Sequence, residues 1–351
     1  MDTDIALILT VDGVTSGAIY VLIALGIVLT YSVTRVIFVP FGDIAAFTAL
    51  TLAQIQSSRL PGTVYIVAVL AILAFLTDAY GLATLGRLSR IGPAAFLYLL
   101  LPALPIGLSW ITAGRDLPMA AQMALALALV LPIAPLIDRI AFRPMARAST
   151  LVLLIIAVAV HFALAGLALI SFGPEGFRTA PLSDARYDIL GATVSLQTIL
   201  VVLAAVLFSG LLYLFFDRTL AGKSLKATAS NRLGARLVGI RPARAGSLAF
   251  LIASALGGIS GLLIGPITTL YYDSGFIIGL KAFVGAIIGG LVSYPLTAAG
   301  ALTVGLLESF ASFYDSALKE TIVFAALIPI LIWRSLASGS SYEDDDEEIE
   351  A

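Results

Sequence analysis

Long apolar runs follow one another along most of this chain and are separated by short polar segments. Many of them exceed about 18 residues, the length at which a helix can cross a hydrocarbon core of roughly 30 Å. In lipid every backbone amide must be bonded within its own segment, which favours helices. A transmembrane barrel is disfavoured because these runs are too long and lack the polar alternation of barrel strands. We predict an all-α, polytopic membrane protein with about 9–11 spans, near residues 5–31, 36–57, 63–84, 94–113, 118–138, 149–172, 194–216, 245–270, 276–293, 296–313 and 320–334.

Two of the predicted regions are less regular than the others. Pro102 and Pro105 interrupt the segment 94–113, and glycines are frequent between residues 276 and 313. Broken helices with free backbone groups are common at the midplane binding sites of transporters. The glycine-rich region could therefore form re-entrant or broken helices.

The composition supports a membrane protein. Charged residues make up 12% of the chain and hydrophobic residues 60%, whereas soluble domains have about 25% charged residues. A very hydrophobic soluble helical protein is a poor alternative. Of the 22 acidic residues, seven lie between Glu343 and Glu350, so the net charge of −2 hides a basic excess elsewhere. We expect a transmembrane domain over 1–338 and a disordered acidic tail over 339–351, which could bind a basic partner.

Basic residues in the short loops predict the orientation, because cytoplasmic loops are enriched in Lys and Arg. The segment RIAFRPMAR has Arg139, Arg143 and Arg147. The basic residues of segment 217–244 are Arg218, Lys223, Lys226, Arg232, Arg236, Arg241 and Arg244. We expect both segments in the cytoplasm, which places the N-terminus in the periplasm and the C-terminal tail in the cytoplasm. The first run lacks the positive region of a cleavable signal, so we expect it to be retained as a span.

An amphipathic helix is predicted inside segment 217–244. Its apolar stripe has one member at every fourth position, namely Leu225, Ala229, Leu233 and Leu237. Its polar faces have Lys226, Asn231, Arg232 and Arg236. Gly239 is placed to end the helix. A helix on the lipid surface, a solvated connector and a helix that docks in a partner's groove all fit this pattern, and the small apolar side chains favour docking.

A few ionisable side chains fall inside apolar runs, where a charge is costly and usually faces a partner or a wet cavity. They are Asp12, Asp78, His161, Lys281 and Glu308. Lys281 could receive a substrate carboxylate, reach an interface with its ammonium group or pair with an internal acid. His161 is the single histidine and the chain has no cysteine, so we expect a hydrogen-bonded interior histidine rather than a metal ligand. We expect no metal site and no cofactor.

Glycines at four-residue spacing occur in several predicted spans, which lets helices approach closely on one face. They are Gly13 and Gly17, then Gly257, Gly261 and Gly265, and finally Gly285 and Gly289. Tight packing inside one chain is the simpler interpretation. A subunit interface, or a substrate path lined by backbone, is the alternative.

Motifs of catalysis are missing from the sequence. No HExxH, GxSxG or paired-carboxylate motif occurs in a recognisable context. The tripeptide at Gly222 resembles the end of a P-loop, but Asp217 stands where the first glycine should be and no strand precedes it. We therefore expect that the chain does not bind ATP by itself and is not an enzyme.

Separated segments of the chain carry a resemblance to a known family. They read DGVTSGAIYVLIALGIVLTYSV, DRIAFRPMARAS, AGKSLKATASNRLGARLVGIRPARAGSLAFLIASALGGISGLL and GLKAFVGAIIGGLVSYP. In this order they resemble the first helix, the ERxAxRPLR loop, the ATPase-contacting cytoplasmic loop with the helix after it, and the GLKAF segment of branched-chain amino acid ABC permeases of the LivH/LivM type. The resemblance covers about residues 1–60 and 136–335.

This resemblance implies the transmembrane permease subunit of an ATP-driven ABC importer in the bacterial inner membrane. Such a permease lines a path with a second, usually non-identical permease, while a periplasmic binding protein delivers substrate and two ABC ATPase subunits dock below. We expect no nucleic acid among its partners. The amphipathic helix then becomes a coupling helix that contacts the ATPases through Leu225, Ala229, Leu233, Leu237 and Gly239, with Arg232 and Arg236 as salt-bridge partners.

Departures from the family pattern limit the prediction of the substrate. The chain reads IFVPFGD where members commonly have INFAHGE, and VSYPLTAAG where they have a GSxPGA segment. The candidate residues of the substrate path are Phe38, Pro40, Phe41, Asp43, Lys281, Ser293 and Tyr294. We expect a more aromatic path, so an apolar or aromatic carboxylate, urea or an amide competes with branched-chain amino acids as cargo. Residues 85–135 have no clear family counterpart and are expected to insert two spans.

Two other classes of function stay open. A self-sufficient secondary transporter or channel could use Asp78, Lys281 or Glu308 for ion coupling. Adjacent genes for two ATPases and a binding protein would speak against it. A membrane enzyme would need an intramembrane nucleophile–base pair or metal site, and no motif supplies one.

Overall fold

The computed structural model describes residues 3–146, 148–183, 185–189, 192–326, 328–330 and 332. The predicted acidic tail at 339–351 and Arg147 lie outside the described residues. Within them, one sheet of two strands accompanies an otherwise helical fold.

In the described part of the chain, eight helices are long and apolar enough to cross a membrane. Six are single helices: α1 (Thr3–Thr34), α3 (Thr63–Thr84), α8 (Thr150–Phe172), α9 (Leu196–Arg218), α12 (Pro242–Ile264) and α14 (Tyr294–Tyr314). Two are composite, with α4 (Ile91–Ala95), η2 (Phe96–Leu100) and α5 (Leu101–Thr112) in one, and α6 (Met119–Val130), α7 (Ile133–Ile137) and η3 (Asp138–Phe142) in the other. The structure confirms the all-α polytopic fold.

Three predicted spans differ from the observed elements. The segment 36–57 forms α2 (Phe41–Gln56), a helix of 16 residues whose side chains are buried on every side. The segment 276–293 forms α13 (Ser274–Ile288), which has 15 residues. Both are shorter than the roughly 20 residues that a span needs. Of the predicted span 320–334, α15 (Lys319–Ala325) occupies the first part, and the remainder lies partly outside the described residues.

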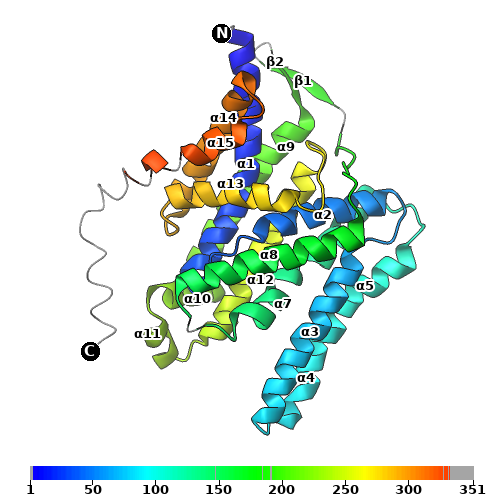
Figure 1. Cartoon of the computed structure of the whole chain (residues 1–351), viewed down its shortest axis with the longest axis vertical. Coiled ribbons are helices and arrows are strands. Elements are labelled where there is room, and N and C mark those ends of the chain that lie inside the picture. The colour runs from blue at the N-terminus through cyan, green and yellow to red at the C-terminus, as the bar shows by residue number, and fades with distance from the viewer. Residues whose placement is uncertain are drawn as a thin grey trace.

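Two polar segments stand apart in the cartoon. Strands β1 (Arg186–Ile189) and β2 (Ala192–Ser195) form an antiparallel hairpin between α8 and α9, near the first residues of α1 at the top of Figure 1. Helices α10 (Leu220–Ser230) and α11 (Arg232–Leu237) follow α9 and lie at the lower left. A short 3-10 turn, η1 (Leu88–Arg90), joins α3 to α4.

Helix α1 is the centre of the molecule. It packs against α9, α12, α13 and α14, and most of its length from Ala18 onward is buried. It also contacts β2 and α10, so the hairpin and the basic loop lie toward opposite ends of a 32-residue helix, about 48 Å at 1.5 Å per residue.

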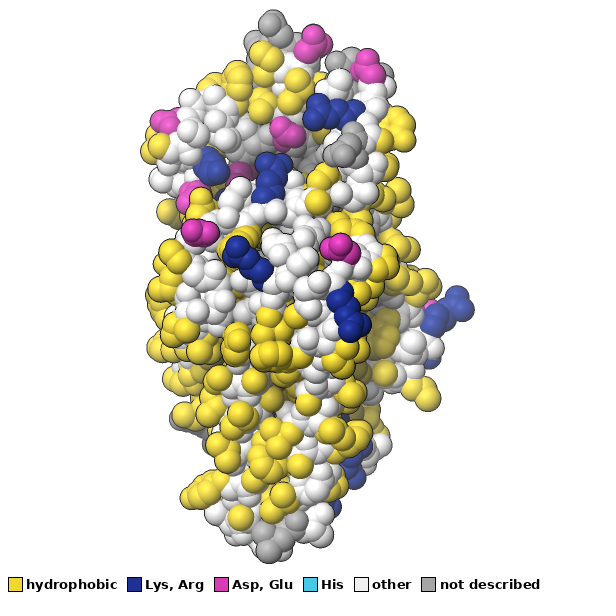
Figure 2. Space-filling model, turned by 90° about the vertical axis from the view of Figure 1, so that its right-hand side faces the viewer, with side chains coloured by type: hydrophobic (Ala, Val, Ile, Leu, Met, Phe, Trp, Pro, Cys, Tyr) yellow, Lys and Arg dark blue, Asp and Glu magenta, His cyan; other side chains and the backbone are white. Residues whose placement is uncertain are grey.

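The outer helices present apolar side chains to the surroundings. Helices α3, α5, α8 and α9 all have exposed Leu, Ile, Val or aromatic residues along their length. Figure 2 shows such side chains over most of the lower part of one face, while charged side chains gather toward its upper part. A continuous apolar surface of this kind is the surface expected where a protein meets lipid.

The regularly spaced glycines lie where helices of this chain touch one another. Gly13 and Gly17 of α1 face Leu302 and Leu306 of α14, and Gly305 of α14 meets both glycines in return. A Cβ atom at Gly13 would lie 2.8 Å from the Leu306 Cα, closer than side chains allow. Glycine here therefore sets the distance between α1 and α14.

The other spaced glycines have similar places. Gly257 and Gly261 of α12 face α2, and a Cβ atom at Gly261 would collide with the Ala45 carbonyl oxygen. Gly265 packs against Thr179 in the loop after α8. Gly285 of α13 and Gly289, directly after that helix, face Ala301 and Thr297 of α14. The structure thus places all of these glycines in contacts within one chain.

Candidate functional site

The basic loop after α9 folds as two short helices rather than one. Thr219 precedes α10, and its Oγ1 accepts a hydrogen bond from the Gly222 amide at 2.9 Å. Asn231 interrupts the helix, and its Oδ1 accepts from the Gly234 amide at 2.8 Å to begin α11. Gly239 then follows α11 with a φ of +86°, the left-handed conformation that ends a helix and that glycine adopts without strain.

The break at Asn231 divides the predicted apolar stripe. Leu225 is fully buried and Ala229 is partly buried, because α10 packs against α9, α12 and α1. Leu233 and Leu237 are instead 68% and 82% exposed, and Val238 beside them is 75% exposed. The expectation of one continuous docking stripe is therefore wrong. The exposed apolar surface consists of Leu233, Leu237 and Val238, and we call it the α11 ridge.

The two arginines of α11 have different environments. Arg232 Nη2 donates to the carbonyl oxygen of Val33 at 2.9 Å, at the last turn of α1. Burial, together with the positive charges of Arg35 and Arg236, lowers the pKa of Arg232. Arg236 is exposed. Arg232 thus ties α11 to α1, whereas Arg236 extends beside the α11 ridge.

A polar cavity of about 270 Å³ lies between α1, α13, α14, α15 and the segment before α13. Lys281 Nζ lies 2.6 Å from Glu308 Oε1 and 3.8 Å from Glu320 Oε1. The hydroxyl of Tyr20 donates to Glu308 Oε2 at 2.6 Å. Lys319 lines the cavity as well. The internal pairing of Lys281, one of the interpretations of the sequence, is what the structure contains.

The chemistry of this cavity suits a small molecule with charges of both signs. Two carboxylates and two ammonium groups line it, and hydroxyls of Thr268 and Ser274 lie at its wall. Charges so placed can bind an ammonium and a carboxylate at once, since each charge favours its opposite within hydrogen-bonding distance. Glu308 and Lys281 have exposed side-chain fractions of 14% and 5%, so water screens them little.

The cavity lies toward the hairpin end of the molecule. Leu270, at its wall, pairs through its backbone with Phe177 in the loop that leads to the hairpin, with N···O distances of 2.9 Å in both directions. Arg178 Nε donates to the carbonyl oxygen of Pro266 at 2.9 Å. These bonds hold the segment 265–273 under the loop.

The remaining path candidates do not meet at this cavity. Phe38 and Phe41 are fully buried and pack edge to face with ring centroids 4.6 Å apart. Phe142 and Phe250 complete the cluster, and their ring centroids lie 5.6 Å and 5.2 Å from that of Phe38. In the structure the two candidates Phe38 and Phe41 pack in the core and line none of the cavities described here, so their place in the substrate path stays a prediction. Pro40 is buried and precedes the first turn of α2.

Asp43 and the two C-terminal candidates lie elsewhere. Asp43 Oδ2 is 2.8 Å from His161 Nδ1, and both side chains are buried. Ser293 accepts from the Leu296 amide at the start of α14. The ring centroids of Tyr294 and Phe216 are 5.3 Å apart. Tyr294 also lines a second cavity, of about 320 Å³, together with Lys226 of α10. Ser293 and Tyr294 are thus at the end of the molecule near the basic loop.

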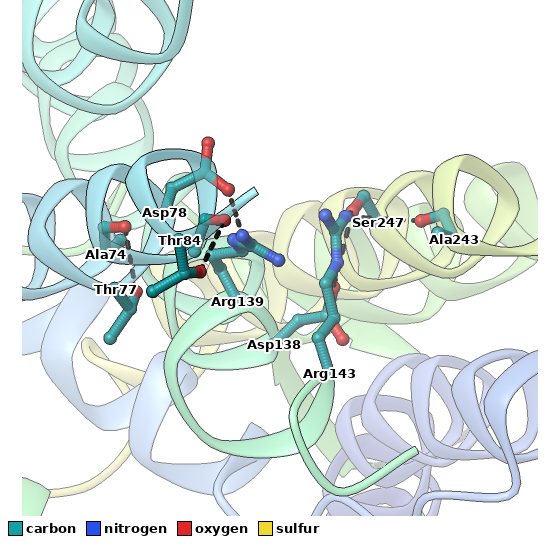
Figure 3. Close-up of polar contacts among 10 residues, drawn as sticks. Ala74, Thr77, Asp78, Thr84, Asp138, Arg139, Arg143, Ala243 and Ser247 are labelled. Atoms are coloured by element: carbon teal, nitrogen blue, oxygen red, sulfur yellow. Dashed lines mark hydrogen bonds and ion pairs between the residues drawn. The ribbon is translucent and has the colours of Figure 1, made fainter. Parts of the chain in front are cut away.

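Figure 3 shows a polar cluster that the sequence did not predict. Asp78 of α3 pairs with Arg139 of η3, and Arg143 Nε lies 3.0 Å from Asp138 Oδ2. Arg143 Nη2 also donates to the Ala243 carbonyl oxygen at 3.2 Å and to Ser247. Asp78 therefore has an arginine partner. The pairing of Asp138 with Arg143 could have been predicted from the segment DRIAFR, in which the acid and the base lie close together.

Comparison with known proteins assigns a family. A family model described as "Branched-chain amino acid transport system / permease component" matches residues 9–331. This confirms the resemblance identified from the motifs.

Curated relatives give the same result. The chain is 28% identical over 205 residues to the high-affinity branched-chain amino acid transport system permease protein BraD of Pseudomonas aeruginosa, which is 56% of this chain and 67% of that protein. It is 30% identical over 204 residues to LivH of Salmonella typhimurium and 29% identical over 203 residues to LivH of Escherichia coli, each covering 56% of this chain and 66% of the relative. The match thus spans slightly less than two thirds of the LivH proteins. No solved structure gives a significant match.

Proposed function

Since the chain belongs to the family of permease components of branched-chain amino acid transport systems, we propose that it is the transmembrane subunit of an ATP-driven ABC importer. Its cargo is a branched-chain amino acid or a related small carboxylate or amide. A second, non-identical permease completes the path, a periplasmic binding protein delivers the cargo, and two ABC ATPase subunits bind at the cytoplasmic side. ATP hydrolysis belongs to those ATPases, because this chain carries no motif for it.

The observation that carries this proposal is the α11 ridge. In the basic loop, Leu225 is packed against the chain's own helices, while Leu233, Leu237 and Val238 are exposed. Exposed apolar side chains with polar surroundings mark a surface for a partner, and a short helix that presents such residues suits a groove. The ATPases are the partners that an importer places there, and Arg236 supplies a charge at the rim.

The polar cavity supports the class of cargo. An amino acid is a zwitterion, and Glu308 and Lys281 offer opposite charges to its ammonium and carboxylate groups. We propose that this cavity is the outer part of the substrate path, reached when α13 and α14 move relative to α1. Cargo would then replace the internal pair of Lys281 and Glu308 with two intermolecular pairs, so little charge is left uncompensated.

The same arrangement supports a position in the inner membrane with a defined orientation. The segment 217–244 has an excess of basic residues, and such segments remain in the cytoplasm. The hairpin lies toward the other end of α1. We therefore propose that the hairpin, the N-terminus and the polar cavity face the periplasm. A cytoplasmic C-terminal tail further requires that the predicted span 320–334, of which α15 is the first part, crosses the membrane.

The alternative of a self-sufficient secondary transporter or channel has less support. Of its candidate groups for ion coupling, Asp78 is paired with Arg139 and does not line the polar cavity. The family model, in addition, describes one component of a transport system rather than a self-sufficient carrier.

The substitution Leu233→Asp tests the proposed coupling. We expect ATP-driven uptake of leucine by cells to fall about ten-fold or more, because a central apolar contact of an interface typically contributes about 2 kcal/mol. The ATPase subunits should no longer co-purify with the variant, although its amount in the membrane stays normal. Mass spectrometry of the purified complex measures the second result.

Leu220→Asp is the matched control. Leu220 is 87% exposed and lies in the same loop, at the start of α10 and away from the α11 ridge. This control should retain its ATPases and its uptake. Normal uptake by Leu233→Asp would contradict the assignment of the α11 ridge, and a single chain that moves leucine without any ATPase would contradict the importer.

A further inference from the structure

An apolar groove lies on the side of the molecule away from the polar cavity. It has a volume of about 620 Å³ and lies between the composite helix 91–112, the composite helix 119–142 and α12. Volumes of roughly 300–1,000 Å³ are typical of sites that bury a small molecule. Leu97, Leu101 and Leu104 line one wall and are 52%, 49% and 67% exposed.

Prolines and wide helical turns explain why the groove is not closed by packing. Pro102 and Pro105 lie in α5, Pro132 and Pro135 lie in or beside α7, and all four line the groove. Each proline removes a helix hydrogen bond or bends the helix. The π-helical segments η2 and η3 widen the same two composite helices. These features leave a gap between the two composite helices and α12 that side chains do not fill.

One end of the groove is positively charged. Arg143 and Arg244 line it there, and none of the described lining residues is acidic. Arg143 is held in place by Asp138, Ser247 and the carbonyl oxygen of Ala243, as Figure 3 shows. Among the described residues, no hydrogen bond or ion pair is found for the exposed guanidinium of Arg244. That guanidinium is the charge available to a ligand.

The first turn of α12 adds to this positive end. Pro242 begins the helix, and Arg244 belongs to its first turn. The amino end of a helix carries a partial positive charge that favours an anion. An occupant of this groove therefore needs a long apolar part and an anionic group at one end.

We propose that the groove binds an anionic phospholipid, with an acyl chain along the leucines and prolines and the phosphate at Arg244, beside Arg143. Both arginines belong to the basic segments expected in the cytoplasm, and the cytoplasmic leaflet is the one that presents anionic lipid to basic pockets between helices. The lipid joins η3 to the start of α12, directly after the loop that contains α11. The inference rests on the proposed orientation and not on the cargo or the ATPases.

Native mass spectrometry of the full chain in detergent tests the site. The delipidated protein is mixed with phosphatidylglycerol or with phosphatidylcholine of identical acyl chains. We expect phosphatidylglycerol to be retained at least about five-fold better, the factor that corresponds to roughly one basic side chain at an anionic membrane surface. Equal retention of the two lipids would overturn the proposal.

Variants separate the groove from a general basic surface. Arg244→Gln should abolish the preference, whereas Arg244→Lys should preserve it. Ala128→Phe fills the groove from an exposed position and should lower retention of both lipids. Arg241→Gln is the matched control, since Arg241 is also exposed and lies three residues away but does not line the groove. Equal losses in Arg241→Gln and Arg244→Gln would overturn the site.

A cysteine at position 104 tests the other possible occupant, a helix of another protein. The native chain has no cysteine, so Leu104→Cys can be cross-linked selectively in native membranes. We expect no cross-link to protein. A cross-link to a second permease would overturn the lipid site and leave the proposed importer standing.

Discussion

Lys281 lies in a buried position with two carboxylates near its ammonium group. Its contact with Glu308 is 2.6 Å long, and Tyr20 holds the other oxygen of the same carboxylate. Breaking a buried ion pair from one side leaves a charge without compensation and typically costs about 3–5 kcal/mol, whereas removing both partners costs much less. A comparison of single and double variants can therefore distinguish a structural role of Lys281 from a role in transport.

We predict that Lys281→Met and Glu308→Gln each lower both stability and leucine uptake. The double variant should recover most of the lost stability but not the uptake, because it lacks both charges proposed to bind a zwitterion. Thermal unfolding in detergent measures the first quantity, and initial uptake rates at equal membrane content measure the second. Recovery of uptake in the double variant would return the pair to a purely structural role.

Single residues show what the sequence could and could not predict about the site. The sequence identified Lys281 and Glu308 as unusual, because charges inside apolar runs need partners. It could not tell whether Phe38 and Phe41 line a path or fill a core, because an aromatic side chain suits either place. Phe142 and Phe250, the residues that enclose them, come from distant segments whose proximity no local pattern reveals.

Helix α14 is held between α1 and α13 by small residues. Gly305 meets Gly13 and Gly17 of α1, and Gly300 meets the backbone of Gly285 on α13. A helix clamped on two sides in this way cannot accept a methyl group without displacing a neighbour. Close packing of this kind depends on both helices, because each must present small residues at the contact.

We predict that Gly305→Ala destabilises the protein by about 1–3 kcal/mol, the usual cost of overpacking. A shift of the unfolding midpoint in detergent measures this change. Gly210→Ala in α9 is the control, since nothing lies within 4 Å of an added Cβ atom there, and it should leave stability unchanged or slightly raised. Equal midpoints for the two variants would argue against a tight α1–α14 contact.

The elements themselves were partly predictable. Hydropathy identified the eight long apolar helices, but it could not distinguish them from the buried short helices α2 and α13, because a segment packed inside protein is as apolar as one in lipid. The four-residue period predicted one helix across 225–237. Asn231 overrode that period, since its side chain bonds the Gly234 amide and such local bonds compete with the helix.

Across the whole molecule, the hairpin and the basic loop lie toward opposite ends of α1. Loops rich in Lys and Arg stay in the cytoplasm. The separation therefore predicts that the basic loop faces the cytoplasm and the hairpin faces the periplasm. The native chain has no cysteine, which allows each end to be labelled alone.

We predict that Asp188→Cys reacts with a membrane-impermeant maleimide in spheroplasts, while Arg236→Cys reacts only after the membrane is opened. Both side chains are exposed, so a difference in labelling reports the side of the membrane rather than burial. Labelling of both positions from outside, or the reverse order, would contradict the proposed orientation.

The bond between Arg232 and the Val33 carbonyl oxygen has a mechanical consequence. Helix α1 is unbroken over 32 residues, and a continuous helix is stiff along its axis compared with a loop of the same length. A displacement of α11 is therefore transmitted to α1 without a flexible segment between the two helices. Helix α1 would transmit this displacement along its axis through the centre of the molecule. Because Tyr20 of α1 lines the polar cavity, a movement of the basic loop would then displace a wall of that cavity.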